Sequence, residues 1–443
     1  MEPKSHDGSS NIRVRLLVAN ENCYHLLQNE DRIEDSTIIG AEEHGIQQPV
    51  SGPTSFSRTC FNGLNALSGV GILSVPYALA SGGWLSLIFL FIIAISTYYT
   101  GLLIQRCMDI DPTIRSYPDI GERAFGINGR MLVSTTMNVE LYMVVTGFLI
   151  LEGDNLQNLF GDIQVQIFGL TIGGKQCFVI MISLIILPTV WLNNMSILSY
   201  ISASGVVASI ILLGSILWAA VFDGIGFQAN DTQLINWKGM PTAVSLYAFC
   251  YCAHPVFPTL YTSMINPKMF SKVMSVCFLL CTISYASMAI LGYLMFGPGV
   301  LSQITLNLPT NKISSKVAIY TTLVNPIAKY SLMIKPIENT IENQLTIHYN
   351  TRVCSLLIRT ALVVSTVVVA LAIPLFGYLM SLVGAFLSIT ASVLLPCLCF
   401  LKISGIYQTL GLEQVVIVVI VIMGIATMVV GTYTSVLEII SHL

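Results

Sequence analysis

Two groups of helix-breaking residues lie inside apolar stretches of this sequence and suggest its chemistry. The first is "SGVG" at 68–71, within an apolar stretch over about 57–80. The second is "YCAHPVFP", in which Pro255 and Pro258 follow His254. Glycine in a helix interior costs about 1 kcal/mol relative to alanine, and proline costs about 3. We therefore expect both stretches to interrupt a helix and to expose backbone amides and carbonyls.

The two expected breaks offer complementary halves of a site for an α-amino acid. Around Gly71 and Ile72 a second half-helix begins, whose amides and positive dipole end favour a carboxylate. Carbonyls over 249–253, where the first half of the other stretch ends, can accept from an ammonium group. The alternative is that the glycines permit tight helix packing and the prolines only kink the chain. With Tyr142 as a wall from the third apolar stretch, the predicted substrate-binding residues are Ser68, Gly69, Val70, Gly71, Ile72, Tyr142, Phe249, Tyr251, Cys252 and Ala253.

Two titratable side chains lie deep inside apolar stretches. Glu140 is about ten residues inside the stretch 131–160, where an ionised carboxylate costs at least about 2.5 kcal/mol. Such a carboxylate is a natural proton carrier; the alternative is a structural acid paired with a loop amide or with a lysine such as Lys329. His254 titrates near physiological pH. Because it adjoins Pro255, we expect it to bind carbonyls that the break sets free.

The composition defines the class of protein. Of 443 residues, 54% are hydrophobic and 10% are charged, against about 25% charged in soluble domains. Long apolar stretches recur that can span the roughly 30 Å hydrocarbon core. The net charge of −3 gives no basic field for nucleic acid. The sequence predicts an all-α polytopic membrane protein with spans at about 57–80, 84–106, 131–160, 177–192, 196–222, 240–262, 272–296, 314–335, 353–373, 378–401 and 412–438.

The two breaks fall in the first and the sixth of these eleven spans. Paired broken helices at corresponding positions of two halves indicate an inverted-repeat transporter, with spans 1–5 and 6–10 as the repeats. Unwound backbone is tolerated at membrane depth only when it is buried in protein or lines a wet cavity. We divide the chain into a disordered cytosolic tail at 1–55, a ten-helix core at 56–402, and an accessory helix with a short C-terminus at 403–443.

The charges and short motifs predict how the chain is oriented. Most of the 20 lysines and arginines lie on the side of the N-terminus, which the positive-inside rule assigns to the cytosol. Asn230 then falls in an outer loop and is a glycosylation candidate. The tail contains "YHLL", Tyr24 to Leu27, a pattern read by sorting adaptors, although an incidental amphipathic turn is the alternative we prefer. Cys250, Cys252 and His254 follow at two-residue steps, which do not share a helix face, so no metal or other cofactor is predicted.

Four segments carry a resemblance to a known family. They are "FNGLNALSGVGILSVPYAL" (61–79), "ELYMVVTGFLILEGDNL" (140–156), "FCYCAHPVFPTLYTSM" (249–264) and "NPIAKYSLMIKP" (325–336). They resemble the amino acid/auxin permease family, most closely its vacuolar amino acid transporter branch, from about residue 55 to the end. The resemblance implies a LeuT-like 5+5 core and secondary active, commonly proton-driven, amino acid transport. Sodium-coupled relatives use an asparagine in span 1 and a hydroxyl in span 8, so the ion-coupling candidates are Asn65, Glu140, Thr321, Thr322 and Asn325.

The function predicted from these features is transport of amino acids, expected to be neutral, by alternating access across a lipid bilayer. The coupling ion is expected to be H⁺, with Na⁺ as the alternative. A vacuolar or similar endomembrane is the expected location, with the plasma membrane as the alternative. A membrane sensor that binds an amino acid and signals is a competing class, and a channel is another. The sequence holds no nucleophile–base–acid constellation, which argues against an enzyme.

Overall fold

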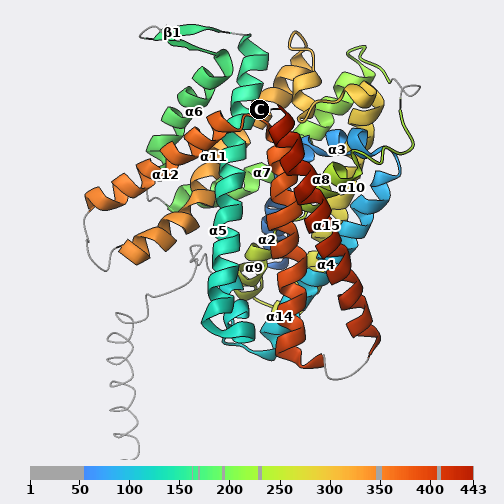
Figure 1. Cartoon of the computed structure of the whole chain (residues 1–443), viewed down its shortest axis with the longest axis vertical. Coiled ribbons are helices and arrows are strands. Elements are labelled where there is room, and N and C mark those ends of the chain that lie inside the picture. The colour runs from blue at the N-terminus through green and yellow to red at the C-terminus, as the bar shows by residue number, and fades with distance from the viewer. Residues whose placement is uncertain are drawn as a thin grey trace, which may run out of the picture. The chain divides into compact units, whose positions relative to one another are not determined.

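The computed structural model describes residues 54–161, 163–167, 170–191, 195–227, 232–345, 352–406 and 411–442, and most of them are helical (Figure 1). The strands within these ranges, β1 (Val165–Ile167) and β2 (Leu170–Ile172), form one antiparallel hairpin. The all-helical fold class predicted from the sequence is confirmed. The adaptor pattern at 24–27 and the glycosylation candidate Asn230 lie outside the described residues.

The helices follow the predicted spans in order. The first span is built from α2 (Phe56–Leu67), η1 (Val70–Leu73) and α3 (Val75–Gly82); the second to fifth are α4 (Ser86–Ile110), α5 (Tyr117–Phe160), α6 (Gly174–Trp191) and α7 (Met195–Val221); the sixth is α8 (Met240–Cys250), η3 (His254–Val256) and α9 (Phe257–Ser263). The seventh to ninth are α10 (Phe270–Phe296), α11 (Ile313–Leu345) and α12 (Arg352–Ala372); the tenth is α13 (Phe376–Leu382), η7 (Val383–Ser388), η8 (Thr390–Leu394) and α14 (Leu395–Ser404); the last is α15 (Leu412–His442). Short turns η4 (Pro267–Met269), η5 (Gly297–Gly299) and η6 (Ile304–Asn307) lie between them.

Length and apolar composition together identify which of the described helices can cross a membrane. Within the described ranges, 7 helices are long and apolar enough to cross one. The broken first and sixth spans fall outside that count, and so do α7 and α11. The total of eleven crossings therefore stays a prediction. Figure 1 places the C-terminal end of α15 toward the same end of the helices as the β1–β2 hairpin, and the α4–α5 connection at the opposite end.

The start of α5 differs from the predicted span, which begins only at 131. The helix starts at Tyr117 because Ser116 and Asp119 form a capping box, each side chain binding the other's backbone amide. A kink at Gly126, whose φ is 67°, then separates this first segment from the long helix. Only glycine adopts that backbone conformation without strain, so the kink depends on this residue.

The tenth span departs from regular α-helix. Its middle consists of two π-helical segments, η7 and η8. A π segment does not use its carbonyls as an α-helix does, and side chains from neighbouring helices bind two of them. The Tyr117 hydroxyl donates to the Ala391 carbonyl at 2.5 Å, and the Thr100 hydroxyl donates to the Ser392 carbonyl at 2.7 Å. Such segments occur frequently at functional sites.

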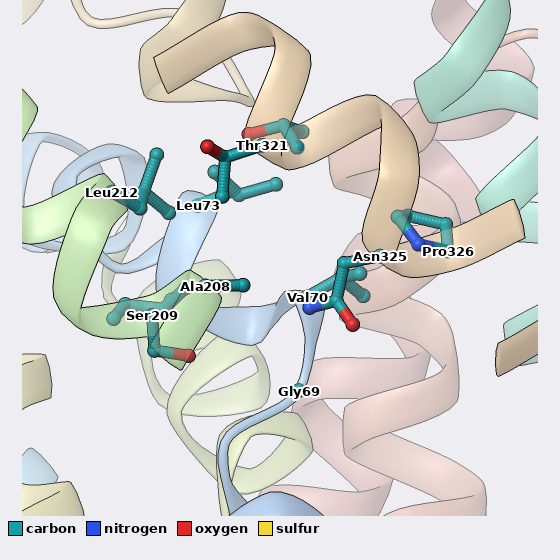
Figure 2. Close-up of a pocket in the computed structure, with 11 residues that line it drawn as sticks. Gly69, Val70, Leu73, Ala208, Ser209, Leu212, Thr321, Asn325 and Pro326 are labelled. Carbon is teal, nitrogen blue, oxygen red and sulfur yellow. The ribbon is translucent and has the colours of Figure 1, made fainter. Parts of the chain in front are cut away.

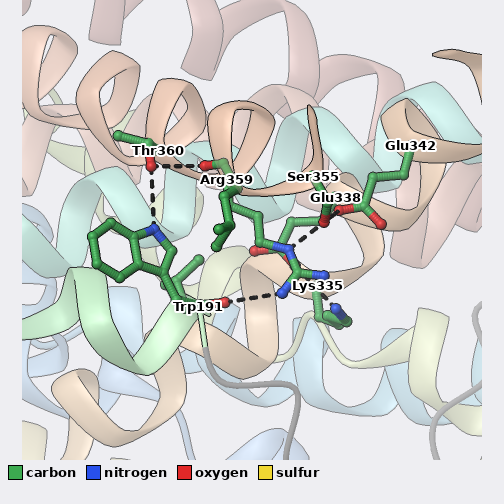
Figure 3. Close-up of polar contacts among 9 residues, drawn as sticks. Trp191, Lys335, Glu338, Glu342, Ser355, Arg359 and Thr360 are labelled. Atoms are coloured by element: carbon green, nitrogen blue, oxygen red, sulfur yellow. Dashed lines mark hydrogen bonds and ion pairs between the residues drawn. The ribbon is translucent and has the colours of Figure 1, made fainter. Parts of the chain in front are cut away.

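A buried ion-pair cluster joins α11, α12 and α6 (Figure 3). Arg359 is only 4% exposed and its Nε lies 3.5 Å from Glu338 Oε2 and 3.2 Å from Glu342 Oε1. The same guanidinium donates from Nη1 to the Val190 carbonyl at 3.4 Å, at the end of α6. Lys335 lies 3.2 Å from Glu338, so each charge in the cluster has an opposite partner.

Arg359→Met should destabilise the protein by roughly 3–5 kcal/mol, because it leaves two carboxylates without their buried partner. Arg123→Met is the matched control, since Arg123 is 59% exposed where it binds Asp111 and such surface pairs contribute about 0–1 kcal/mol. Thermal unfolding of the detergent-purified protein measures both. Equal melting temperatures for the two variants would contradict a structural role for the cluster.

Candidate functional site

The first span is interrupted where the sequence predicted. The helix α2 ends at Leu67, and Gly69 is extended, with φ −89° and ψ −168°. The turn η1 then leads into α3, which has Pro76 in its first turn, where a missing amide proton costs least. The amides of Val70 and Gly71 open η1 and donate no hydrogen bond to another described residue.

The sixth span is interrupted as well. The helix α8 ends at Cys250, and the chain continues without regular structure until η3 begins at His254. The Cys252 carbonyl receives no hydrogen bond from another described residue. The second break therefore presents a free carbonyl, as the first presents free amides.

The two breaks are in direct contact. The hydroxyl of Tyr285, a buried residue of α10, donates to the Leu67 carbonyl at the first break and lies 3.2 Å from the Cys250 carbonyl at the second. A Cβ placed on Gly71 would lie 2.8 Å from Cys250 Sγ and 3.2 Å from Cys250 Cα. Only glycine at 71 lets the two unwound segments approach this closely.

Glu140 lies beside the second break. Its Oε1 accepts from Cys252 Sγ at 2.8 Å and from the Ser388 hydroxyl of η7 at 2.6 Å, and the residue is 5% exposed. Lys329, which was considered as a partner for Glu140, binds the Ser68 carbonyl instead, so that pairing was wrong. Glu140 thus connects the broken sixth span to the π segment of the tenth.

The other ion-coupling candidates gather beside the first break. A cavity of about 20 Å³ lies between η1, α7 and α11, lined among others by Gly69, Ser209 and Pro326 (Figure 2). Space of this size holds a water molecule but not an amino acid. The candidates Thr321, Thr322 and Asn325 line it, and Asn65 lies on the neighbouring helix α2 with its Oδ1 against Gly205.

Two tyrosines among the predicted substrate contacts point elsewhere. The Tyr142 hydroxyl donates to Ser365 of α12 at 3.1 Å, because position 142 lies on a different face of α5 from Glu140. The structure therefore does not bring Tyr142 to the breaks. The Tyr251 hydroxyl donates to Thr282 of α10, and its ring stacks on Phe278, so Tyr251 contributes backbone to the break while its side chain packs away.

His254 binds a carbonyl, but not one freed by the break. The residue is fully buried, and its Nε2 lies 3.1 Å from the Thr97 carbonyl and 2.9 Å from the Thr100 hydroxyl, both in α4. Cys250, Cys252 and His254 thus face three different neighbours. They do not converge on one point.

Sequence reasoning missed three residues of this region. Nothing in the sequence distinguishes Ser388 from other serines in apolar spans. It reaches Glu140 because it lies in the π segment η7. Glu152, near the end of the stretch 131–160, was not singled out as a site residue, but it is fully buried and neither carboxylate oxygen has a hydrogen-bond partner among the described residues. Lys329 was considered only as a partner for Glu140; its place one helical turn beyond Asn325 was a usable signal.

The broken first and sixth spans, packed on each other, define an inverted-repeat membrane transport fold. The chain belongs to the transmembrane amino acid transporter family, whose model, described as "Transmembrane amino acid transporter protein", matches residues 52–437. This confirms the family predicted from the sequence motifs. The family and the relatives below are transporters, not enzymes.

Relatives of high similarity come from Arabidopsis thaliana. The chain is 61% identical to amino acid transporter AVT1J over 88% of its own length and 92% of the relative's. It is 57% identical to amino acid transporter AVT1I over 89% and 98%. Among solved structures it is similar to a Na⁺-coupled sialic acid symporter in a substrate-bound, outward-open state, with a TM-score of 0.51 and 13% identity, covering 86% of this chain and 90% of that one. That likeness supports the LeuT-like fold.

Proposed function

We propose that this protein moves neutral amino acids by proton-driven secondary active transport with alternating access. The observation that carries the proposal is the contact between the two breaks through Tyr285 and Gly71. A site held between two unwound segments of opposite repeats can open to either side when the bundle that carries spans 1 and 6 rocks against the remaining helices.

The substrate would bind to the backbone at both breaks. Its carboxylate would accept from the amides of Val70 and Gly71, near the positive end of the following half-helix. Its ammonium would donate to the Cys252 carbonyl. Ser68, Gly69, Ile72, Phe249 and Ala253 would shape the pocket around these contacts.

The side chains at the breaks favour a neutral substrate. Phe249, Cys250 and Ala253 carry no charge, and the nearby carboxylate of Glu140 already accepts two hydrogen bonds. A charged substrate side chain would be buried there without a partner, which is unfavourable. Labelled alanine and leucine should therefore be better substrates than glutamate or arginine.

Glu140 is the coupling candidate at the second break, because it alone among the five can exchange a proton. The glutamine in Glu140→Gln keeps an oxygen that can accept from Cys252 and Ser388, but its side chain cannot ionise. Alanine uptake by this variant should lose its dependence on pH, with at least about a tenfold smaller response to an imposed pH gradient. Glu122→Gln, an exposed position on the same helix, is the control. A wild-type pH profile in Glu140→Gln would show that this acid is structural.

The unpartnered oxygens of Asn65, Thr322 and Asn325 favour Na⁺ as the competing coupling ion, since hard cations bind oxygen ligands. Uptake of labelled alanine into proteoliposomes tests the function and separates the ions. Accumulation driven by a proton gradient alone supports the proposal, whereas accumulation that requires a sodium gradient overturns the coupling. Saturable binding without accumulation would indicate a sensor, and flux that does not saturate would indicate a channel.

The membrane and orientation belong to the same proposal. We place the protein in the vacuolar or a similar membrane, with the tail at 1–55 and its adaptor pattern in the cytosol. The core would extend over 56–402 and the accessory helix over 403–443. A protease added to sealed vacuoles should remove a tag at the N-terminus. If the tag is protected from the protease, the proposed orientation is wrong.

A further inference from the structure

We propose that the Lys329 ammonium, from α11, is a permanent part of the break in the first span, and that it releases and regains one proton in each transport cycle. The inference rests on the proposed transport function and adds a second proton-binding group to it, at the other break from Glu140. The residue was not among the ion-coupling candidates.

The ammonium is buried at the break. Lys329 is 7% exposed, and its Nζ donates to the Ser68 carbonyl at 3.4 Å, where α2 has just ended. This carbonyl has no partner in its own helix, because the chain leaves helical geometry at this point. A lysine from α11 thus supplies the donor that the interrupted helix lacks.

The packing of α7 leaves room for this contact. A Cβ placed on Gly205 would lie 1.9 Å from Asn65 Oδ1 and 3.2 Å from Lys329 Nζ. The glycine therefore lets the amide oxygen and the ammonium reach the same place against the α7 backbone. Buried oxygens of Asn65, Thr322 and Asn325 nearby have no hydrogen-bond partner among the described residues. Such an oxygen-rich site suits a hard cation, and the ammonium supplies that charge.

No carboxylate among the described residues lies within 4 Å of the Lys329 ammonium. Glu152 of α5 is buried without a hydrogen-bond partner in the described part of the chain, but it lies beyond that distance from the ammonium. The other charged or titratable groups considered on the elements packed around Lys329 have other partners or lie exposed. These groups are Tyr330, Lys335 and Glu338 on α11, Glu140 and Tyr142 on α5, Arg359 on α12, Lys175 on α6, Tyr285 on α10 and Arg58 on α2. The helix α7 has no charged residue over Gly205–Val221.

A buried ammonium without a counter-ion gives up its proton more readily than a paired one. When the site opens, the ammonium can transfer one proton to water, leaving a neutral amine and a hydronium ion. The hydrogen bond to Ser68 then loses its charge assistance, which is the stronger part of such a bond. Reprotonation from water on the other side restores the ammonium, so each cycle carries one proton and resets the first break.

The repeats give this arrangement an internal counterpart. Span 3 and span 8 are equivalent when spans 1–5 and 6–10 are the repeats. From span 3, Glu140 binds the break of span 6, and from span 8, Lys329 binds the break of span 1. Each repeat thus contributes one titratable side chain to the broken span of the other.

The test uses the full-length protein in proteoliposomes with labelled alanine, measured as accumulation under a pH gradient and as exchange without a gradient. Lys329→Met keeps the length of the side chain without its charge, and Lys329→Arg keeps a cation that does not release its proton. Both should lose at least about tenfold in proton-driven accumulation, because each removes the charge change at Ser68. Both should retain exchange. Lys316→Met, an exposed lysine on the same helix, should behave as wild type.

Each other result has a distinct meaning. Proton-driven accumulation by either Lys329 variant at the wild-type level would overturn the inference, and so would loss of exchange together with accumulation, which indicates a structural lysine. If Lys329→Met does not fold, Lys329→Arg carries the test alone. Wild-type accumulation that depends on sodium would overturn the inference while leaving amino acid transport intact. Absence of any alanine transport by the wild type would instead reject the proposed function.

Discussion

Gly71→Ala is expected to abolish most amino acid transport while leaving the protein folded and in the membrane. The added Cβ would lie 2.8 Å from Cys250 Sγ and 3.2 Å from Cys250 Cα, so the two unwound segments must separate. Overpacking of this kind costs about 1–3 kcal/mol. That is enough to lower alanine uptake about tenfold or more if the contact closes the substrate site. Uptake is measured in proteoliposomes, and abundance is measured in the membranes of the expressing cells.

Two comparisons separate this contact from a general effect of the methyl group. Gly214→Ala is the matched control, because Gly214 is an exposed glycine of α7 around which a Cβ meets nothing within 4 Å. Cys250→Ala removes the nearer clashing atom, so Gly71→Ala combined with Cys250→Ala should recover part of the lost uptake. Normal uptake by Gly71→Ala alone would show that the glycines of "SGVG" only permit tight helix packing.

The positions of the helices were predictable because the bilayer requires long apolar stretches and this sequence has few polar interruptions. The broken first span was predictable for the same reason, since Ser68, Gly69 and Gly71 are conspicuous in an apolar segment. The early start of α5 was missed. It depends on a capping box and a single glycine kink in a polar segment, and a hydropathy pattern does not report on either.

The site was predictable as backbone but not as side chains. The sequence indicated that residues near Gly71 and Cys252 expose amides and carbonyls, because that follows from where the helices stop. Which side chain meets which break depends on helix rotation, and a change of one residue turns a helix by about 100°. Tyr142 was assigned to the wrong face for this reason. Lys329 was considered only as an alternative partner for Glu140, because its place near Asn325 on α11 does not show which backbone carbonyl it binds.

The π segments of the tenth span were the largest feature missed. Their sequence, "VGAFLSITASVLL" at 383–395, reads as an ordinary apolar helix. The irregular geometry is sustained by partners far away in the chain, Thr100 and Tyr117, which bind two of its carbonyls. It matters for function because η7 carries Ser388 to Glu140 and so links the tenth span to the second break.

Gly384→Ala should lower the amount of folded protein, which is a different failure from that of Gly71→Ala. A Cβ on Gly384 would lie 2.0 Å from the Ser245 carbonyl oxygen and 2.9 Å from its carbon, both backbone atoms of α8. A flexible side chain can move aside, but the helix backbone cannot, so η7 and α8 would have to separate along their contact. We expect the membrane abundance of Gly384→Ala to fall about tenfold or more, since overpacking against rigid backbone costs at least about 1–3 kcal/mol.

The comparison between the two alanine variants tests the architecture as a whole. Gly384 holds the tenth span against the first half of the broken sixth span, whereas Gly71 holds the two broken segments against each other. If the first contact is required for folding and the second only for the substrate site, Gly384→Ala loses protein and Gly71→Ala loses only transport. Fluorescence size-exclusion profiles of tagged variants measure this difference directly. A monodisperse, abundant Gly384→Ala would show that α8 and the tenth span can separate without loss of the fold, and it would contradict a structural role for this contact.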